Sequence, residues 1–143
     1  MADYYGLTAL GVVCALGNDA ETVWRRASAG DTSGMKPLEG VLPDGQTTPF
    51  GMCDVETGGC PSRVAALLAA ASKEISREVE QLKSVYGAKR IGVVVGTSNS
   101  TMEEFTANPD RIDMSTPAFF LREHLALQGP ALAVSTACSS SIK

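Results

Sequence analysis

The sequence predicts an α/β fold, in which helices cover a mainly parallel sheet. Three observations support this prediction: short continuous apolar runs at residues 91–95 and 131–134, helical apolar patterns around them, and turn residues at the segment boundaries. Continuous apolar runs of this length are typical of strands that are buried on both faces of a parallel sheet. Helices that alternate with such strands are typical of α/β proteins.

The composition is that of one ordinary globular domain, and it argues against several functions. The 143 residues are 44% hydrophobic and 20% charged, with a net charge of −4. An acidic chain without a basic cluster is a poor candidate for nucleic-acid binding. No apolar run approaches the roughly 18–20 residues of a membrane helix. The apolar run at residues 7–16 follows no basic residue, so it does not resemble a secretory signal, and we expect a cytoplasmic protein.

The first elements are a predicted strand, a short helix and a long irregular segment. Residues 7–13 are apolar and partly β-branched, which predicts a buried strand. Asn18 or Asp19 is expected to cap a helix that continues through Ala27, with Gly30 beyond its end. Residues 31–61 are rich in Gly, Pro, Thr and Asp, which predicts an irregular excursion of unusual length.

A long amphipathic helix and two strands dominate the rest of the chain. Ser62 is expected to cap the helix, which continues to about residue 84 because apolar residues recur at spacings of three and four. The elements expected after it are a strand at 91–95, a polar loop at 96–100, a helix from about 101, a helix at 117–127 and a strand at 131–134.

The four cysteines indicate neither a metal site nor a disulfide framework. They form no Cys-x-x-Cys pair and have no histidine at zinc spacing, so we predict no metal and no cofactor. Cys138 differs from the others because it follows an apolar strand at a corner of small residues, where α/β enzymes present nucleophiles. A helix start there favours a thiolate and offers backbone N–H groups to an oxyanion. On spacing alone, a nucleophile and a buried structural cysteine are equally supported.

The segment VSTACSSS at residues 134–141 resembles the nucleophile motif of the β-ketoacyl synthases, the condensing enzymes of fatty-acid and polyketide synthesis. Other segments resemble the same family in order and spacing, namely residues 6–18, 24–34, 91–98 and 128–131. The resemblance covers nearly the whole chain and implies a thiolase-like layered α/β/α/β/α fold. The serine-rich motif also resembles that of synthases of specialised polyene pathways.

The resemblance implies covalent catalysis at Cys138. This residue would accept an acyl group from an acyl thioester on acyl carrier protein. A malonyl thioester would then lose carbon dioxide and attack the held acyl carbon, giving a 3-oxoacyl thioester two carbons longer. The Cys138 N–H would be one oxyanion donor. The two histidines and the lysine that the family uses for decarboxylation follow the nucleophile and have no counterpart here. We therefore expect residues 1–143 to be the N-terminal part of a longer synthase and to be inactive alone.

The remaining candidate residues concern binding rather than chemistry. The resemblance implies that Asn99, Phe119 and Phe120 lie near the acyl pocket and a dimer contact. The two phenylalanines would limit chain length by their bulk, or else be core residues, and the polar Asn99 favours a shorter or polyunsaturated acyl chain. Arg63 is a candidate docking contact for acidic carrier protein, with a solvated helix end as the alternative. His124, the one histidine, matches no catalytic position and is expected to be a structural helix residue.

Two other functions compete with an elongating synthase. The resemblance implies a dimer, either of two copies or with a related synthase subunit, so this chain is alternatively a non-catalytic partner of the chain-length-factor type. That class usually replaces the nucleophile, and the presence of Cys138 argues against it. A cysteine hydrolase with the same corner would need a histidine and an acid near Cys138, and nothing in the motif supports one.

Overall fold

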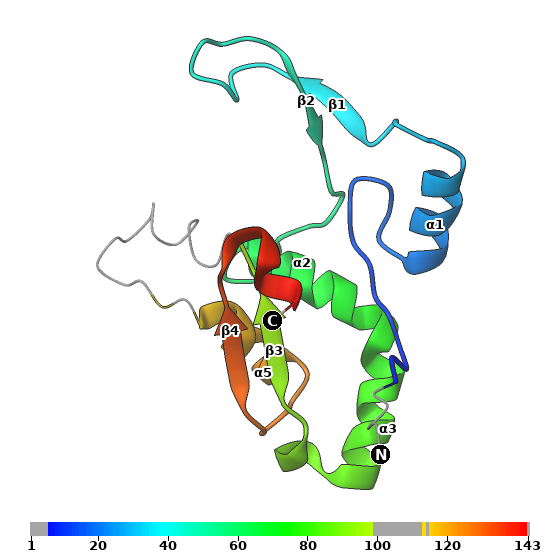
Figure 1. Ribbon diagram of the computed structural model, residues 1–143, viewed down its shortest axis with the longest axis vertical. Helices are drawn as coiled ribbons and strands as arrows, with labels where there is room; N and C mark the ends of the chain where they lie inside the picture. Colours follow the sequence, from blue (N-terminus) through cyan, green and yellow to red (C-terminus); the bar gives the residue numbers. More distant parts are fainter. Residues whose placement is uncertain (1–5, 99–112, 114, 143) are drawn as a thin grey trace. The chain divides into compact units, whose positions relative to one another are not determined.

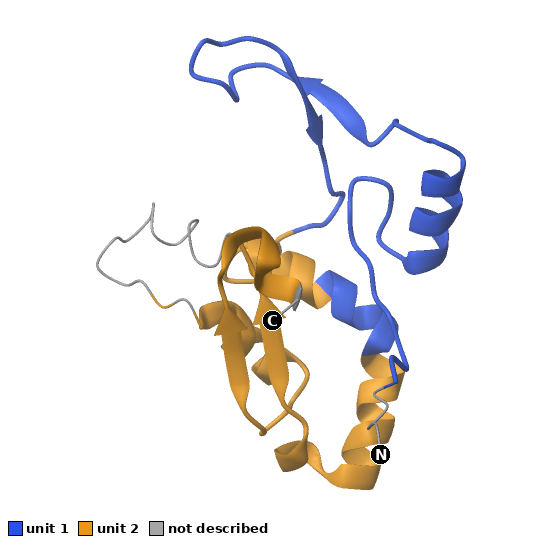
Figure 2. Cartoon of the chain, viewed as in Figure 1, with its two compact units in different colours: residues 1–56, 70–75 blue, residues 57–69, 76–143 orange. Residues whose placement is uncertain are grey.

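The computed structural model describes residues 6–98, 113 and 115–142 (Figure 1). Its elements are α1 (Ala20–Ser28), β1 (Met35–Leu38), β2 (Thr48–Gly51), α2 (Arg63–Ser72), η1 (Lys73–Ile75), α3 (Ser76–Tyr86), η2 (Ala88–Arg90), β3 (Val93–Gly96), α5 (Thr116–His124), β4 (Ala131–Val134) and η3 (Ala137–Ile142). They divide into two compact units (Figure 2). The first is Met1–Glu56 with Ala70–Ile75, and the second is Thr57–Ala69 with Ser76–Lys143.

The helix α1 of the first unit begins and ends where its capping residues predict. The Asp19 carboxylate accepts a hydrogen bond of 2.8 Å from the Thr22 N–H, which is one of the donors that a helix start leaves unpaired. That hydrogen bond lowers the pKa of Asp19 below its ordinary value. Gly30 follows the helix with a φ of 66°. This left-handed conformation is easy for glycine and is common just after a helix.

The strand predicted at residues 7–13 is wrong, because this segment forms no ladder. The Val12 N–H of this segment donates instead to the Glu74 carboxylate at 3.0 Å, which also accepts the N–H of Ala20, the first residue of α1, at 3.0 Å. Gly11 lies so close to α2 that a Cβ placed on it would be 2.0 Å from the Ala71 carbonyl oxygen. Leu7 is 84% exposed. An apolar, β-branched run therefore passes along a helix here without becoming a strand.

A two-stranded antiparallel hairpin, β1–β2, lies within the excursion predicted to be irregular. Its register pairs Met35 with Gly51 and Leu38 with Thr48. Pro37 and Pro49 face each other in the middle of the pair, and proline contributes no ladder N–H. Most residues of both strands are exposed, so no alternation of apolar and polar residues marked them in the sequence.

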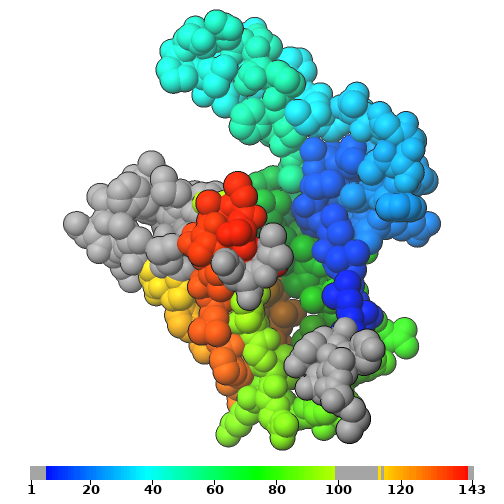
Figure 3. All heavy atoms as spheres, in the orientation of Figure 1, coloured from blue at the N-terminus to red at the C-terminus, as the bar shows by residue number. Residues whose placement is uncertain are grey.

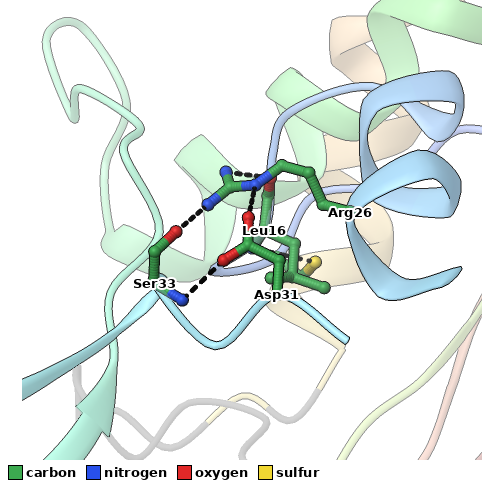
Figure 4. A network of polar contacts seen from close by, with 5 residues as sticks. Leu16, Arg26, Asp31 and Ser33 are labelled. Carbon is green, nitrogen blue, oxygen red and sulfur yellow. Dashed lines mark hydrogen bonds and ion pairs between the residues drawn. The ribbon is translucent and has the colours of Figure 1, made fainter. Parts of the chain in front are cut away.

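A polar network ties the end of α1 to the chain before β1 (Figure 4). The Arg26 guanidinium donates to the Asp31 carboxylate at 2.6 Å, to the Leu16 carbonyl oxygen and to the Ser33 hydroxyl. The other oxygen of Asp31 accepts the Ser33 N–H at 2.7 Å. One arginine therefore holds three backbone segments of the first unit. The hydrogen bond from Arg26, followed by those from Ser33, holds the pKa of Asp31 well below its ordinary value.

We expect this network to persist from neutral pH to about pH 4 and to weaken only in stronger acid. A carboxylate whose pKa is lowered in the folded state stabilises it above the unfolded-state pKa, about 3.9. That contribution disappears as the pH falls through the folded-state value. NMR titration of the Asp31 carboxyl and the Ser33 amide between pH 7 and pH 2 measures it. An Asp31 carboxyl that titrates near pH 4 contradicts the expectation, and Asp31→Asn is the control without the titrating group.

The second unit contains the parallel strand pair that the sequence predicts. Strands β3 and β4 pair in parallel, with Val93 opposite Ala131 and Gly96 opposite Val134. Helix α5 packs against both strands, on the face where Val93 and Val95 are buried (Figure 1). The predictions of strands at 91–95 and 131–134 and of a helix at 117–127 are therefore confirmed within a few residues.

The long helix predicted at 62–84 is also confirmed, with one interruption. Ser62 caps α2, since its hydroxyl accepts the Ala65 N–H at 3.2 Å. The 3₁₀ turn η1 then separates α2 from α3. The helix expected from about residue 101 lies outside the described residues. Within the described part of the chain, no helix has the length and apolar character needed to cross a membrane.

Close backbone contacts align the starts of the two parallel strands. A Cβ on Gly129 would lie 2.2 Å from the Ile91 carbonyl oxygen, so only glycine allows this approach. Val93 N–H donates to the Pro130 carbonyl at 2.8 Å, and Gln128 N–H donates to the Ala88 carbonyl at 2.9 Å. These contacts hold the segment before β4 against the segment before β3. The carboxyl ends of the two strands therefore meet at the same edge of the sheet, where the candidate site lies.

Candidate functional site

Cys138 occupies the corner that follows β4. The strand ends at Val134, and η3 begins at Ala137, so Cys138 is the second residue of the helical segment. Its side chain is exposed, and its thiol forms no disulfide. The segment that contains it lies at the surface of the second unit (red in Figure 3). In the described structure Cys138 is therefore not buried, unlike the expectation for a structural cysteine. The expected helix after the corner is a six-residue 3₁₀ segment.

The backbone turns sharply immediately before Cys138. Ala137 has a φ of 54°, which lies in the left-handed region that residues with a Cβ seldom adopt. Such a conformation persists only where surrounding contacts hold it. Here the turn reverses the chain between β4 and η3 and leaves the Cys138 side chain accessible. Its neighbours on both sides, Ala137 and Ser139, have small side chains.

The hydroxyl of Ser140 is the centre of the hydrogen bonding beneath this corner. Ser140 is 6% exposed. Its oxygen accepts the Thr136 N–H at 2.8 Å, and its proton faces two carbonyl oxygens, that of Ala137 at 2.7 Å and that of Thr97 at 3.1 Å. Thr97 follows β3, and Thr136 follows β4. One buried side chain therefore joins the ends of both strands to the turn that carries Cys138.

Gly96 allows η3 to lie directly on the end of β3. A Cβ at this position would be 2.7 Å from the Ser140 carbonyl oxygen and 2.9 Å from the Ser141 nitrogen. Both are backbone atoms, which cannot move aside as a flexible side chain can. Thr97 N–H continues the ladder by donating to the Val134 carbonyl at 3.0 Å. The absence of a side chain at Gly96 is therefore a condition for the position of η3.

Two further hydroxyls lie on the outer side of the turn. The Ser139 hydroxyl donates to the Thr136 carbonyl oxygen at 3.0 Å, and it is 3.0 Å from the Thr136 hydroxyl. The Ser139 N–H also reaches the Thr136 carbonyl, at 3.4 Å. These contacts are local to the turn. In contrast, the Ser140 hydroxyl reaches across to the other strand.

The two candidate pocket phenylalanines lie on α5, where each contacts a side chain one turn further along. The Arg122 guanidinium lies 5.0 Å from the centroid of the Phe119 ring, and Phe119 is 37% exposed. Phe120 stacks on His124 with a centroid distance of 5.6 Å. His124 is the last residue of α5, so it is a helix residue as expected. Neither phenylalanine is among the buried core residues of the helix, which are Pro117 and Ala118.

Arg63 and Asn99 are the remaining candidate residues. Arg63 is the first residue of α2 and is partly exposed. Asn99 lies outside the described residues. No group of three or more histidine, cysteine or acidic side chains in the described ranges is arranged to hold a metal ion. The described geometry therefore provides an exposed thiol at a turn after β4.

Sequence reasoning missed Ser140 and Gly96. Ser140 belongs to the run of three serines after Cys138, and Gly96 begins the Gly-Thr-Ser loop after the predicted strand at 91–95. A run of three serines gives no indication of which hydroxyl is buried. The only signal for Ser140 was its place within the first turn after the predicted nucleophile, where unpaired backbone groups need partners. The signal for Gly96 was a glycine at the carboxyl end of a buried strand, which often marks a close backbone approach.

Comparisons with known proteins find similarity among solved structures. No protein-family model and no curated protein matches the chain. Among solved structures, it is similar to a chain from the Xenorhabdus doucetiae ketosynthase ApeO in complex with its chain length factor ApeC. The two are 29% identical in sequence with a TM-score of 0.77, and the match covers 94% of this chain and 40% of that one. The protein thus has a thiolase-like fold of the ketosynthase type, of which this chain spans a part, and it is related to condensing enzymes.

Proposed function

We propose that the protein is a β-ketoacyl synthase that forms 3-oxoacyl thioesters on acyl carrier protein, in fatty-acid or polyketide and polyene synthesis. The observation that carries the proposal is the exposed Cys138 thiol, at a strained turn after β4, in a fold similar to that of a ketosynthase complex. A reactive nucleophile must be accessible, whereas a structural cysteine is usually buried. Cys138 is the nucleophile in this proposal.

The first half-reaction transfers an acyl group to Cys138. The Cys138 thiolate attacks the carbonyl carbon of the acyl thioester, and a sulfur–carbon bond forms while the carbonyl oxygen becomes an oxyanion. The Cys138 N–H donates to that oxygen. The oxyanion collapses, the bond to the carrier's sulfur breaks, and the carrier leaves as a thiolate that takes up a proton. The proton count balances, because Cys138 gave up one proton when it formed the thiolate.

The second half-reaction needs groups beyond this chain's described corner. A malonyl thioester loses carbon dioxide, and the resulting carbanion attacks the acyl carbon held on Cys138. The Cys138 sulfur then leaves with the electron pair, and the 3-oxoacyl product is released. Two histidines and a lysine assist this step in the family that the sequence resembles. The chain spans 40% of the matched ketosynthase-complex chain, so we propose that it is the N-terminal part of such a synthase domain.

The acyl-transfer step gives the direct test. The purified natural protein is incubated with acyl-loaded carrier protein, and its intact mass is measured. We expect a mass increase of one acyl group that peptide mapping assigns to Cys138. The further addition of malonyl-loaded carrier protein is expected to release that group as a product two carbons longer. A protein that takes up no acyl group, or takes it up at another residue, contradicts the proposal.

A partner subunit of the chain-length-factor type is the second candidate. It is supported by the matched structure, which contains a ketosynthase together with its chain length factor. In that case the protein assembles with a related synthase, and the acyl group appears on the partner rather than on this chain. Mass spectrometry of the assembled complex separates the two functions, because each subunit carries its own mass.

We propose that carrier protein docks near Arg63, at the start of α2. Carrier proteins are acidic, so a basic residue on the docking surface favours their approach. We expect Arg63→Glu to raise the KM for carrier-bound acyl groups by roughly 5-fold to 10-fold and to leave acylation by a small-molecule thioester unchanged. Arg25→Glu on α1 makes the same charge change at an exposed position and serves as the matched control. Equal effects of the two variants would assign the change to net charge alone.

The proposed acyl pocket involves residues of α5 and the loop after β3. Phe119 and Phe120 on α5 are proposed to limit the length of the acyl chain. Asn99 is proposed to favour a short or polyunsaturated one. The Phe119 ring lies against Arg122, and the Phe120 ring stacks on His124.

A further inference from the structure

We infer that Ser140 is the positioning residue for the oxyanion donor at Cys138, an inference that rests on the proposed acyl-transfer function. The described hydrogen bonds of the Ser140 hydroxyl go to Thr136, Thr97 and Ala137, and not to the Cys138 thiol. Ser140 acts through the peptide group between Ala137 and Cys138. The Ser140 hydroxyl lies 2.7 Å from the carbonyl oxygen of that peptide group and, by donating to it, fixes how the group is turned.

Because the peptide group is trans, the contact of the Ser140 hydroxyl with the Ala137 carbonyl also determines the direction of the Cys138 N–H. The carbonyl oxygen of Ala137 and the N–H of Cys138 belong to one planar group and lie on opposite sides of it, and the described chain contains no cis peptide bond. A hydroxyl that holds the oxygen on the inner side therefore directs the N–H to the outer side. Cys138 itself is exposed. The same hydrogen bond polarises the amide and strengthens its N–H as a donor.

A second set of contacts keeps the hydroxyl itself in place. Ser140 is 6% exposed, and its oxygen accepts the Thr136 N–H at 2.8 Å, which leaves its proton available for a carbonyl. The Thr97 carbonyl at 3.1 Å is the weaker acceptor, and it ties the group to the end of β3. The hydroxyl therefore has a fixed donor on one side and two carbonyls on the other. Its direction is set by both strands.

The strained turn explains why the hydrogen bond from the Ser140 hydroxyl to the Ala137 carbonyl, called the Ser140 clamp below, is needed. With a φ of 54°, Ala137 is held in a conformation that a residue with a Cβ leaves readily when its contacts are removed. Relaxation of Ala137 would rotate the following peptide group and move the Cys138 N–H. The thiol would remain exposed after such a rotation. Loss of Ser140 is therefore expected to impair oxyanion stabilisation while sparing the reactivity of the thiol.

Two reactions of the same thiol separate these effects. Acylation by a thioester passes through an oxyanion, whereas alkylation by iodoacetamide does not. We expect Ser140→Ala to lower the rate of Cys138 acylation by roughly 10-fold or more and to leave its alkylation rate within about twofold of the original protein. Ser141→Ala is the matched control, because Ser141 is an exposed serine of the same segment. It is expected to change neither rate.

Other outcomes overturn the inference. Unchanged acylation in Ser140→Ala shows that the Ser140 clamp is not needed, and an equal fall in both rates shows that Ser140 only supports the fold. Where Ser140→Ala does not fold, Ser140→Thr and Ser140→Val replace it. These variants have the same shape and differ in the hydroxyl, so only the threonine variant is expected to retain acylation. Equal rates in the two overturn the inference.

A spectroscopic measurement distinguishes failure of this inference from failure of the proposed function. Loss of the hydrogen bond to the Ala137 carbonyl is expected to shift the amide resonance of Cys138 in Ser140→Ala and not in Ser141→Ala. This shift does not depend on any thioester reaction. A protein that shows the shift but takes up no acyl group has the Ser140 clamp without the proposed function. A protein that takes up the acyl group without the shift has the function without the Ser140 clamp.

Discussion

Replacement of Cys138 by alanine is expected to abolish acyl uptake and to lower condensation by roughly 10³-fold or more. The proposed reaction proceeds through a bond between the Cys138 sulfur and the acyl carbon, and alanine has no atom that can form it. Alanine fits the exposed position without a clash, so the fold should be unaffected. Intact-mass measurement with acyl-loaded carrier protein, together with a product assay, gives both quantities.

A matched thiol deletion shows whether the effect is specific to Cys138. Cys60 is partly buried and lies in the same unit, and its N–H donates to the Thr57 carbonyl at 2.9 Å. Cys60→Ala removes a thiol far along the chain from the corner and is expected to retain acyl uptake. If Cys138→Ala leaves the activity of an assembled synthase complex intact, the catalytic assignment is wrong. The chain would then be a partner subunit of the chain-length-factor type.

The parts of the fold that sequence reasoning predicted are those in which local pattern and tertiary environment agree. The valines at 93–95 and the run Ala131–Val134 are continuous apolar segments, and they form the two parallel strands. Asp19 and Ser62 each precede a helical pattern, and each caps its helix. The turn that places Cys138 after β4 followed from the same pattern, a buried strand that runs into small residues. The role of Cys138 as a nucleophile stays a prediction.

The parts that sequence reasoning did not predict depend on contacts between residues far apart in the sequence. Residues 7–13 have the composition of a strand, but the Glu74 carboxylate takes the Val12 N–H, and no ladder forms. The β1–β2 hairpin holds two facing prolines and mostly exposed residues, so it lacks the alternation by which strands are recognised. Ser140 is one of three consecutive serines, and only the fold determines that its hydroxyl reaches Thr97.

Gly96→Ala is expected to have the largest structural effect at the site. The new Cβ would be 2.7 Å from the Ser140 carbonyl oxygen, 2.8 Å from its carbon and 2.9 Å from the Ser141 nitrogen, all of them backbone atoms. The overlap can be relieved only if η3 moves away from β3. Such overpacking costs on the order of 1–3 kcal/mol. The movement also separates the Ser140 hydroxyl from the Thr97 carbonyl, so we expect Cys138 acylation to fall by roughly 10-fold or more.

Gly58→Ala distinguishes this contact from a general effect of replacing glycine. Gly58 is in the same unit, and a Cβ added there meets nothing within 4 Å. It is therefore expected to leave both unfolding and acylation unchanged. Thermal unfolding and the rate of Cys138 acylation measure the two variants side by side. If Gly96→Ala matches Gly58→Ala in both measurements, then η3 does not depend on close contact with β3, and the end of β3 cannot be what holds the Cys138 turn in place. If Gly96→Ala alone loses acylation, then acylation of Cys138, which follows β4, requires that the residue at the end of β3 has no side chain.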